Sequence, residues 1–416
     1  MKKNIWPSVV DGCVSAPPSK SEAQRAIALA TMAKGQSRIV RPGHSDDVMA
    51  VIKLCRHLGA DIRWQDDDLL VDGGFRAPDV SLNCGESGLA IRMFSGLAAL
   101  FDKEITLTGT GSLTARPMET IEKALIRVGV HCSTHEGFLP VRVKGPLTGG
   151  SAELDGSAGS QVITGLLMAA ALAPDDSFLK IKNLKSKPYA DLTLEIMHAF
   201  GAAARHDAHL HFFIPGNQQY RPVVFETGGD WSGAAFMLVA GAVAGRVKVN
   251  GLNHQRSQAD KRICEALEMA GAEIRMWNDT KGAVETRKRN LRAFHFDATD
   301  CPDLFPPLVA LASYCDGQTA ITGLHRLYSK ESDRAAALQD CFRRMGVSIR
   351  TEGDQMIIHG KRPGPAVVDA HGDHRIAMAA AVAAFGGEGP VTIRGAQAVN
   401  KSYPTFFDDL YRITRK

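Results

Sequence analysis

Apolar and small residues gather in several long stretches that lack a polar helical face. Three of them run over residues 163–173, 234–244 and 376–385 and are rich in alanine. A helix that is apolar on all sides is buried among other elements, because none of its faces suits water. The longest such run, 233–245, falls well short of the roughly 20 residues that a membrane-spanning helix needs. We therefore expect buried helices and no membrane contact.

A second pattern recurs along the whole chain. Each time, a helical stretch ends at a glycine, which is followed by alanine or valine and then by a β-rich segment. Glycine commonly follows a helix end because it accepts left-handed backbone. These glycines stand 70 to 75 residues apart and are Gly59, Gly129, Gly201, Gly271 and Gly346. The period divides the chain into about six units, as repeat architectures do.

A short polar motif also opens an alanine-rich helix once per unit. The markers of these openings lie 69 to 73 residues apart and are Ser19, Gly88, Ser160, Asp230, Asp303 and Asp373. Units that mix strands and helices at a fixed period predict an α/β protein, here two domains of three units each. The marker is Ser or Gly in the first half and Asp in the second, which indicates halves with different chemical roles.

Cations gather at these openings or in the loops that follow. They are Lys20, Arg25, Arg92, Arg116, Arg334, Arg375 and Lys401. Ser and Asp at a helix start are, taken singly, ordinary caps, but helix N-termini also favour anions. An unpaired charge beside an apolar helix is costly, so converging cations call for a polyanionic ligand. Arginine suits carboxylate and phosphate groups.

Two carboxylates are placed for proton transfer. Asp303 opens the fifth helix, and Glu331 lies between cations in the segment 330–334. An ordinary helix start with local ion pairs would explain that segment equally well.

Composition and missing motifs exclude several function classes. Lys and Arg (49) nearly balance Asp and Glu (45), and aromatic residues make up 6%, so we expect no nucleic-acid surface built on stacking aromatics. Eight cysteines are scattered without a CxxC pair, which suggests reduced structural thiols. The first residues lack the apolar segment of a signal peptide, and we expect a cytoplasmic location.

Metal and nucleotide sites are not indicated. His371 and His374 are three residues apart with no third ligand nearby, whereas metal sites usually need three or four. No GxGxxG or GxxxxGK[ST] loop follows an expected strand. We expect neither a metal ion nor a cofactor.

Five segments resemble, in order along the chain, the EPSP synthases of the enolpyruvyl transferase family. They are PPSKS at 17–21 with Arg25 beyond it, SKPY at 186–189, KESDR at 330–334, HGDHRIAM at 371–378 and KSYP at 401–404. The resemblance implies an α/β fold of two domains, each with three βαβαββ repeats around buried central helices. It also implies a first domain at 19–227, a second made of 1–18 with 228–416, and an active site in the cleft between them.

The family reaction transfers the enolpyruvyl (1-carboxyvinyl) group of phosphoenolpyruvate to the 5-hydroxyl of shikimate 3-phosphate and releases phosphate. It serves the shikimate pathway to chorismate and the aromatic amino acids. The resemblance implies these two substrates and inhibition by glyphosate, which Gly88 favours because it leaves the phosphoenolpyruvate pocket uncrowded. We expect a monomer.

The resemblance also implies site residues, motif by motif. For shikimate 3-phosphate they are Lys20, Ser21, Arg25, Ser160, Gln161, Ser186, Tyr189, Asp303 and Lys330. For phosphoenolpyruvate they are Lys20, Gly88, Arg92, Arg116, Gln161, Arg334, Arg375 and Lys401. Asp303 is expected to take the hydroxyl proton, Glu331 to handle the proton at C3 of phosphoenolpyruvate, and Lys20 to assist the departing phosphate.

Four residues depart from the family pattern. Glu86 adds negative charge near the expected phosphoenolpyruvate site, and Gly159 lacks the hydroxyl of a serine that often contacts phosphate. Ser112 replaces an arginine, and Arg326 stands where a smaller polar residue is common.

Three alternatives stay open at this point. The sister enzyme that acts on UDP-N-acetylglucosamine shares fold and repeat, but it commonly carries a reactive cysteine in the loop corresponding to 109–115, which has none here. RNA-end binding on the same repeat would need stacking aromatics and a basic face. A catalytically silent member is disfavoured because both Asp303 and Glu331 are present.

Overall fold

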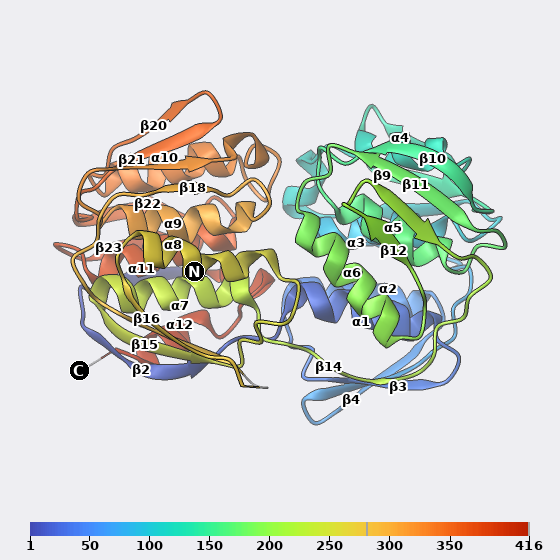
Figure 1. Cartoon of the computed structure of the whole chain (residues 1–416), viewed down its shortest axis with the longest axis horizontal. Coiled ribbons are helices and arrows are strands. Elements are labelled where there is room, and N and C mark those ends of the chain that lie inside the picture. The colour runs from blue at the N-terminus through green and yellow to red at the C-terminus, as the bar shows by residue number, and fades with distance from the viewer. Residues whose placement is uncertain (280–281, 415–416) are drawn as a thin grey trace. The chain divides into compact units, whose positions relative to one another are not determined.

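The computed structural model describes residues 1–279 and 282–414. The chain forms two compact units, shown as a ribbon in Figure 1. One unit, here called the N-terminal unit, is Pro18–Thr227. The other, the C-terminal unit, combines Met1–Pro17 with Gly228–Lys416. Residue 18 thus lies with the N-terminal unit, whereas the sequence analysis assigned it to the other part.

The N-terminal unit alternates strands and helices. Its strands are β3 (Gln36–Val40), β4 (Asp61–Gln65), β5 (Asp68–Asp72), β6 (Leu82–Asn83), β7 (Ile105–Thr108), β8 (His131–His135), β9 (Phe138–Lys144), β10 (Gly150–Asp155), β11 (Ser177–Lys182), β12 (Arg205–Asp207), β13 (His211–Ile214) and β14 (Val224–Glu226). Its helices are α1 (Lys20–Met32), α2 (Asp46–His57), α3 (Gly88–Ala98), the 3-10 helix η1 (Gly111–Ala115), α4 (Glu119–Arg127), α5 (Gln161–Ala170) and α6 (Lys187–Ala199).

These strands form one sheet topology three times. The strand orders are β14-β3-β5-β4, β6-β7-β9-β8 and β10-β11-β13-β12. In each sheet the first two strands run parallel and the next two pairs are antiparallel. In two of the sheets the parallel strands are joined through a helix, α3 between β6 and β7 and α5 between β10 and β11, as parallel pairing requires. The repeat found in the sequence is therefore a repeat of sheet topology.

The C-terminal unit follows the same plan. Its strands are β1 (Lys2–Ile5), β2 (Val10–Ser15), β15 (Gly245–Asn250), β16 (Glu273–Trp277), β17 (Ala283–Arg287), β18 (His295–Asp297), β19 (Gln318–Thr322), β20 (Ile349–Glu352), β21 (Gln355–His359), β22 (Ala366–Asp369) and β23 (Val391–Arg394). Its helices are α7 (Trp231–Ala244), η2 (Ala259–Arg262), α8 (Ile263–Met269), η3 (Pro302–Leu304), α9 (Phe305–Ala312), η4 (Leu324–Arg326), α10 (Arg334–Arg344), α11 (His374–Phe385), η5 (Ala396–Lys401) and α12 (Phe406–Arg412).

Two of its sheets have the four-stranded pattern, with orders β16-β17-β15-β2 and β18-β19-β21-β20. The remaining sheet, β1-β23-β22, has three strands within the described part of the chain. It keeps the parallel pair β22 and β23, and β1 supplies the antiparallel neighbour. The sixth repeat is thus a shortened copy that is completed by the start of the chain.

Strand exchange explains why the C-terminal unit has two parts. The strand that precedes α1 in sequence, β2, pairs in parallel with β15 of the C-terminal unit. The strand that precedes α7, β14, pairs in parallel with β3 of the N-terminal unit. Each of these strands completes a sheet whose other strands lie far away in the sequence.

The helix that opens each repeat is buried, as the sequence predicts. Every residue of α7 is buried, and α11 is buried along its whole length. Helices α3 and α5 approach closely at two glycines, since a Cβ atom on Gly96 would lie 2.4 Å from the carbonyl carbon of Gly165. None of the described helices is both long and apolar enough to cross a membrane.

The helix stops are confirmed as well. The five repeat glycines have φ between +80° and +100°, a conformation that other residues adopt only at a cost. The sequence period therefore marked true helix ends.

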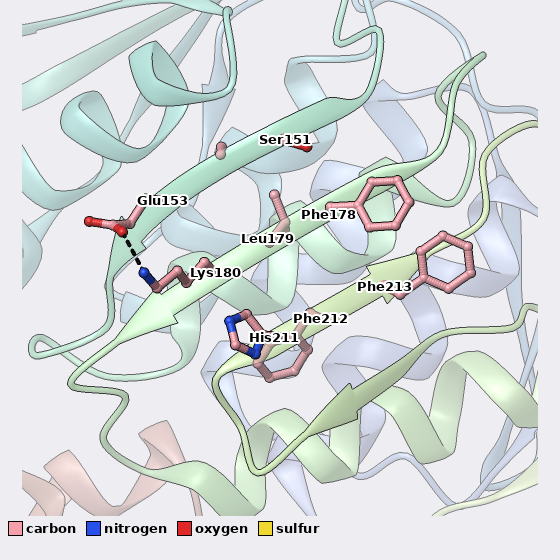
Figure 2. A pocket seen from close by; sticks show the side chains of 9 residues that line it. Ser151, Glu153, Phe178, Leu179, Lys180, His211, Phe212 and Phe213 are labelled. Carbon is pink, nitrogen blue, oxygen red and sulfur yellow. Dashed lines mark ion pairs between the residues drawn. The ribbon is translucent and has the colours of Figure 1, made fainter.

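The sheet β10-β11-β13-β12 of the N-terminal unit has a shallow hollow on one face, shown in Figure 2. There the rings of Phe178 and Phe213 lie 4.9 Å apart, and Lys180 pairs with Glu153. The residues that line this hollow include none of those expected to bind substrate.

Candidate active site

Most of the helix openings are ordinary N-caps. The side chain of Ser19 accepts a hydrogen bond from the backbone N–H of Glu22 at the start of α1, and Asp230 and Asp373 cap α7 and α11 in the same way. Asp303 differs, because it lies inside η3 and caps no helix in the described structure. Its carboxylate is bound to cations instead.

Arg334 is the centre of a charged cluster in the C-terminal unit. It is the first residue of α10, and its side chain is completely buried (0% exposed). Nε donates to Asp373 at 2.9 Å, Nη1 to Asp303 at 2.9 Å and Nη2 to Glu331 at 2.6 Å. Burial would lower the pKa of this guanidinium, but the three carboxylates raise it above its ordinary value. A buried charge of this kind is tolerated only when it is fully paired.

Asp303 joins three cations of the same unit. Besides Arg334, its carboxylate accepts from Nη2 of Arg375 at 3.0 Å and lies 3.5 Å from Nζ of Lys330. Burial alone would raise the pKa of this carboxyl, but Arg375, Lys330 and Arg334 together hold it well below its ordinary value. Asp303 is therefore ionised at neutral pH.

Lys330 lies in an environment that disfavours its charge. Burial lowers its pKa to about 8, with further lowering by Arg334 and Arg326 and an opposing effect of Asp303. Arg326, at the end of η4, is itself buried. Burial lowers its pKa too, while Asp300 and Asp303 act in the opposite direction. The departure at position 326 thus adds a cation to the field around Asp303.

One neighbour of this cluster was missed by the sequence analysis. Asp260 in η2 is completely buried and accepts a hydrogen bond from the hydroxyl of Ser232. Burial, with the charge of Asp303, raises the pKa of its carboxyl to about 7, while Arg375 opposes the shift. No sequence signal distinguished Asp260 from the many exposed aspartates of the chain.

In the N-terminal unit, Arg25 joins three helices. It is 2% exposed. Its Nε donates to Thr193 at 2.9 Å, and its Nη2 donates to Thr164 at 3.1 Å. Its Nη1 and Nη2 also donate to the carbonyl oxygens of Ser21, at 2.8 Å, and Tyr189, at 3.5 Å.

Every one of these acceptors is a neutral oxygen. Burial lowers the pKa of Arg25 to about 10, with Tyr189 and Glu22 opposing. A buried guanidinium that is solvated by neutral groups keeps an attraction for an anion. Arg25 therefore suits a phosphate.

Lys20 at the start of α1 pairs with Asp47 of α2, with Nζ 2.8 Å from Oδ2. Next to it, the amide of Gln24 donates to the carbonyl of Asp47 at 2.9 Å and to the hydroxyl of Ser87 at 3.1 Å. These bonds tie α1 to the openings of α2 and α3. Asp47 was not singled out from the sequence, because an acidic first turn is an ordinary helix signal.

Gly88 and Arg116 lie in close contact. A Cβ atom on Gly88 would lie 2.4 Å from Nη1 of Arg116. The Arg116 side chain is buried, and its Nε has no hydrogen-bond partner among the described residues. Arg92 lies nearby, with Nη1 donating to the carbonyl of Gly88 at 3.0 Å and Nη2 to that of Pro117 at 3.2 Å. Arg116 therefore packs over the backbone of Gly88, which has no side chain, at the start of α3.

Glu86 and Ser112, two of the residues that depart from the family pattern, are hydrogen-bonded to each other. The carboxylate of Glu86 accepts hydrogen bonds from the backbone N–H and the hydroxyl of Ser112, at 3.1 and 2.8 Å. Glu86 thereby binds the first turn of η1, where its negatively charged carboxylate accepts both hydrogen bonds. Gly159, by contrast, has φ +115°, so a serine at this position would be strained.

The remaining expected residues lie at helix ends. Ser160 is the N-cap residue of α5, makes no side-chain capping bond, and directly precedes Gln161. Ser186 is the N-cap of α6, with left-handed backbone at φ 56°. Lys401 ends η5 and is buried. Direct contacts therefore join Asp303, Lys330, Glu331, Arg334 and Arg375 in one unit, and Ser21, Arg25 and Tyr189, as well as Gly88, Arg92 and Arg116, in the other.

A family model described as EPSP synthase (3-phosphoshikimate 1-carboxyvinyltransferase) matches residues 6–410. The chain belongs to the EPSP synthase family. The expectation drawn from the motifs is thereby confirmed, and the sister enzyme that acts on a sugar nucleotide is not favoured.

Relatives among the EPSP synthases cover the chain from end to end. It is 38% identical to the 3-phosphoshikimate 1-carboxyvinyltransferase of Methanococcoides burtonii, over 99% of this chain and 98% of the relative. It is 37% identical to that of Aeropyrum pernix, over 98% of this chain and 95% of the relative.

Solved structures agree with this family and with the expected fold. The EPSP synthase from Acinetobacter baumannii superposes with a TM-score of 0.84 at 26% identity, over 99% of this chain and 98% of that one. The enolpyruvyl transferase NikO from Streptomyces tendae gives a TM-score of 0.78 over 99% of this chain and 96% of that one, and at 17% identity it shows the fold alone. The two-domain enolpyruvyl-transferase fold is confirmed.

Proposed function

We propose that the chain transfers the enolpyruvyl group of phosphoenolpyruvate to the 5-hydroxyl of shikimate 3-phosphate, giving 5-enolpyruvylshikimate 3-phosphate and phosphate. Family membership supports this reaction. The observation that carries the proposal is the cluster in which Asp303 pairs with Arg334, Arg375 and Lys330, while Glu331 pairs with Arg334. It combines carboxylates that can move protons with arginines that suit a carboxylate or a phosphate.

The residues proposed to bind phosphoenolpyruvate are those that the family motifs imply. In the C-terminal unit these are Arg334, Arg375 and Lys401, and in the N-terminal unit Lys20, Arg92 and Arg116, with Gly88 and Gln161. Arg116 is the best placed of the second group, because its buried Nε has no partner among the described residues. Its packing against Gly88 supports a role in holding a compact anion at the start of α3.

Shikimate 3-phosphate would be bound by the Arg25 network. The phosphate of this substrate suits Arg25, whose hydrogen bonds within the described residues all go to neutral oxygens, together with the hydroxyls of Ser21, Ser160 and Ser186. Gln161, Tyr189 and Lys330 would hold other parts of the same substrate. Ser160 supports this assignment because its hydroxyl makes no capping bond.

Asp303 is proposed as the base that takes the proton of the 5-hydroxyl. Its depressed pKa makes it a weak base while Arg375, Lys330 and Arg334 surround it. Anionic substrates would compete for those cations, and each cation that turns to a substrate raises the basicity of Asp303. The base would then gain strength as the substrates bind.

The chemistry proceeds by addition and then elimination. The 5-hydroxyl oxygen bonds to C2 of phosphoenolpyruvate as C3 takes up a proton, which gives a tetrahedral intermediate. Elimination then breaks the C2–O bond to phosphate and removes a proton from C3. Glu331 is proposed for the proton transfers at C3, and Lys20 for the charge of the departing phosphate. The surrounding cations stabilise charge that shifts during both steps.

Three further expectations accompany the reaction. Glyphosate should inhibit in competition with phosphoenolpyruvate, because Gly88 presents no side chain at that site. One chain should suffice for activity, since all the proposed contacts come from a single chain. The enzyme should work in the cytoplasm, where phosphorylated substrates are retained.

Phosphate release tests the proposal. Purified protein is given phosphoenolpyruvate with either shikimate 3-phosphate or UDP-N-acetylglucosamine. We expect release with shikimate 3-phosphate alone, and a fall in kcat of about 100-fold or more for Asp303→Asn. Asp316→Asn, an exposed aspartate of the same unit, should leave kcat unchanged. Release with only the sugar nucleotide, or with neither acceptor, would contradict the proposal.

A further inference from the structure

Two histidines and an aspartate of the N-terminal unit meet outside the residues proposed to bind substrate. Asp191 lies on α6, His206 on β12, and His209 on the turn between β12 and β13. Nε2 of His206 and Nε2 of His209 both lie 2.8 Å from the same carboxylate oxygen, Oδ1 of Asp191. The two imidazole rings are stacked, with centroids 4.1 Å apart. Three potential metal ligands therefore converge on one point.

The short turn accounts for this convergence. Ala208 and His209 both have left-handed backbone, with φ of +47° and +59°. The chain folds back so that the backbone N–H of His209 donates to Nδ1 of His206 at 3.2 Å. The ring of His209 is thereby brought onto that of His206, and both face Asp191 on the neighbouring helix.

We propose that Asp191, His206 and His209 bind a divalent transition-metal ion, with Zn²⁺ as the favoured ion. Two imidazole nitrogens and one carboxylate oxygen form a ligand set that is common for Zn²⁺ with an open coordination position. Imidazole ligands select Zn²⁺, Cu²⁺, Ni²⁺ and Co²⁺ over Mg²⁺ and Ca²⁺, which prefer oxygen. This site lies apart from His371 and His374, where the sequence analysis considered and rejected a metal.

The three side chains need to move only a little to coordinate an ion. The candidate ligand atoms all lie within 4.8 Å of one another. Ligands about 2.0–2.2 Å from a tetrahedral Zn²⁺ are roughly 3.3 Å apart, so the nitrogens need to move about half an ångström away from the carboxylate oxygen. The side chains of His206, His209 and Asp191 are 18%, 24% and 31% exposed, which leaves one side open to solvent for the ion to enter and for water to complete its coordination.

Binding changes the position of the ring protons. Without the ion, an Nε2–H group of each ring can donate to Asp191. Coordination through Nε2 moves that proton to Nδ1. His206 must then give up the hydrogen bond that its Nδ1 accepts from the His209 amide, so the environment of this amide reports directly on binding.

The ion would tie the β12–β13 turn to α6. The same helix begins at the Ser186 N-cap and carries Tyr189, but Asp191 contacts the turn, whereas Thr193 contacts Arg25. We infer a stabilising role for the ion, separate from the chemistry of the reaction.

Calorimetric titration of the full-length, untagged and chelator-treated protein with ZnCl₂ tests the site. We expect one ion to bind per chain and to raise Tm. Asp191→Asn, His206→Ala and His209→Ala should each weaken binding by at least about tenfold. His211→Ala removes a nearby exposed imidazole from outside the triad and should leave affinity unchanged. Enzyme turnover without Zn²⁺ checks that each variant is folded.

Two further measurements separate this site from surface binding. Co²⁺ should give visible absorption bands that His206→Ala abolishes and His211→Ala keeps, and the NMR signal of the His209 amide should shift when Zn²⁺ is added. No binding by the parent protein, equal loss in His211→Ala and His206→Ala, or equally tight binding of Mg²⁺ would overturn the proposal.

Discussion

At the scale of single residues, the cations of the charged cluster already have partners before any substrate arrives. Arg334 is saturated by three carboxylates, and Asp303 is held by three cations. Neutralising a buried charge costs less than leaving it bare, so this arrangement lets the chain fold with a strongly charged site. Substrate binding then exchanges internal ion pairs for ion pairs with the ligand.

The pH dependence of substrate binding follows from Lys330. Its pKa of about 8 means that its ammonium group loses its charge as the pH rises through about 8, whereas an ordinary lysine stays charged to about 10.5. We expect KM for shikimate 3-phosphate to rise over this range. Lys330→Arg, which stays charged, should flatten the profile measured by initial rates from pH 6.5 to 9.5. A parent profile that is flat through pH 8 would contradict this role.

A second prediction concerns the close contact between Gly88 and Arg116. A methyl group there would strike the guanidinium of Arg116, and the far end of that side chain would move. Gly88→Ala should raise KM for phosphoenolpyruvate about tenfold and should raise the inhibition constant of glyphosate by at least as much.

A double-mutant cycle with Arg116→Ala checks the mechanism. If Gly88→Ala acts by displacing Arg116, its effect should largely vanish in the Arg116→Ala background. Additive effects would show that the methyl group acts directly on the ligand.

At this scale, the sequence predicted which residue types form the site better than it predicted the contacts that those residues make. Ser19, Asp230 and Asp373 looked alike as helix markers and are indeed caps, but Asp303 looked the same and is not. The orientation of Glu86 could not be predicted, because its partner Ser112 lies 26 residues away and only the folded loop brings them together.

At the scale of elements, Arg25 fastens α1 to α5 and α6 through Thr164 and Thr193. These threonines carry no motif, and they were missed because each is an ordinary residue in the interior of a helix. Their hydroxyls fix the guanidinium in one orientation.

Thr193→Val tests this positioning role. The change keeps the shape of the side chain and leaves Nε of a buried arginine without its partner, which should cost about 1–3 kcal/mol of unfolding free energy. We expect KM for shikimate 3-phosphate to rise severalfold, while kcat changes little. Thr193→Ser should restore both values, measured by denaturant unfolding and initial rates. A fall in kcat with unchanged KM would place Thr193 in the chemistry instead.

At the scale of the whole molecule, the sequence pattern predicted six repeats and buried helices. It did not predict which strands pair with one another. β14 pairs with β3 although 183 to 189 residues separate their ends in the sequence, and a pattern of apolar residues carries no information about such distant partners. Only the family resemblance pointed to the exchange of the first residues between domains.

The strand exchange predicts which fragments fold. The fragment 18–227 contains every strand of its own sheets, so it should unfold cooperatively on its own. The fragment 228–416 lacks β1 and β2 and should stay largely unfolded until a peptide of residues 1–17 is added. Circular dichroism and thermal unfolding of the two fragments check this. Cooperative unfolding of 228–416 without the peptide would contradict it.

The same exchange sets an order of events during synthesis on the ribosome. The first strand to be made, β1, pairs with β23, which is among the last, in the register Lys2 with Arg394. The N-terminal unit has all its strands once residue 226 has emerged, whereas β1 must wait, unpaired, until nearly the whole chain has been made. Because an exposed strand edge invites pairing with other chains, this waiting period is when a nascent chain is most open to misassembly and to chaperones.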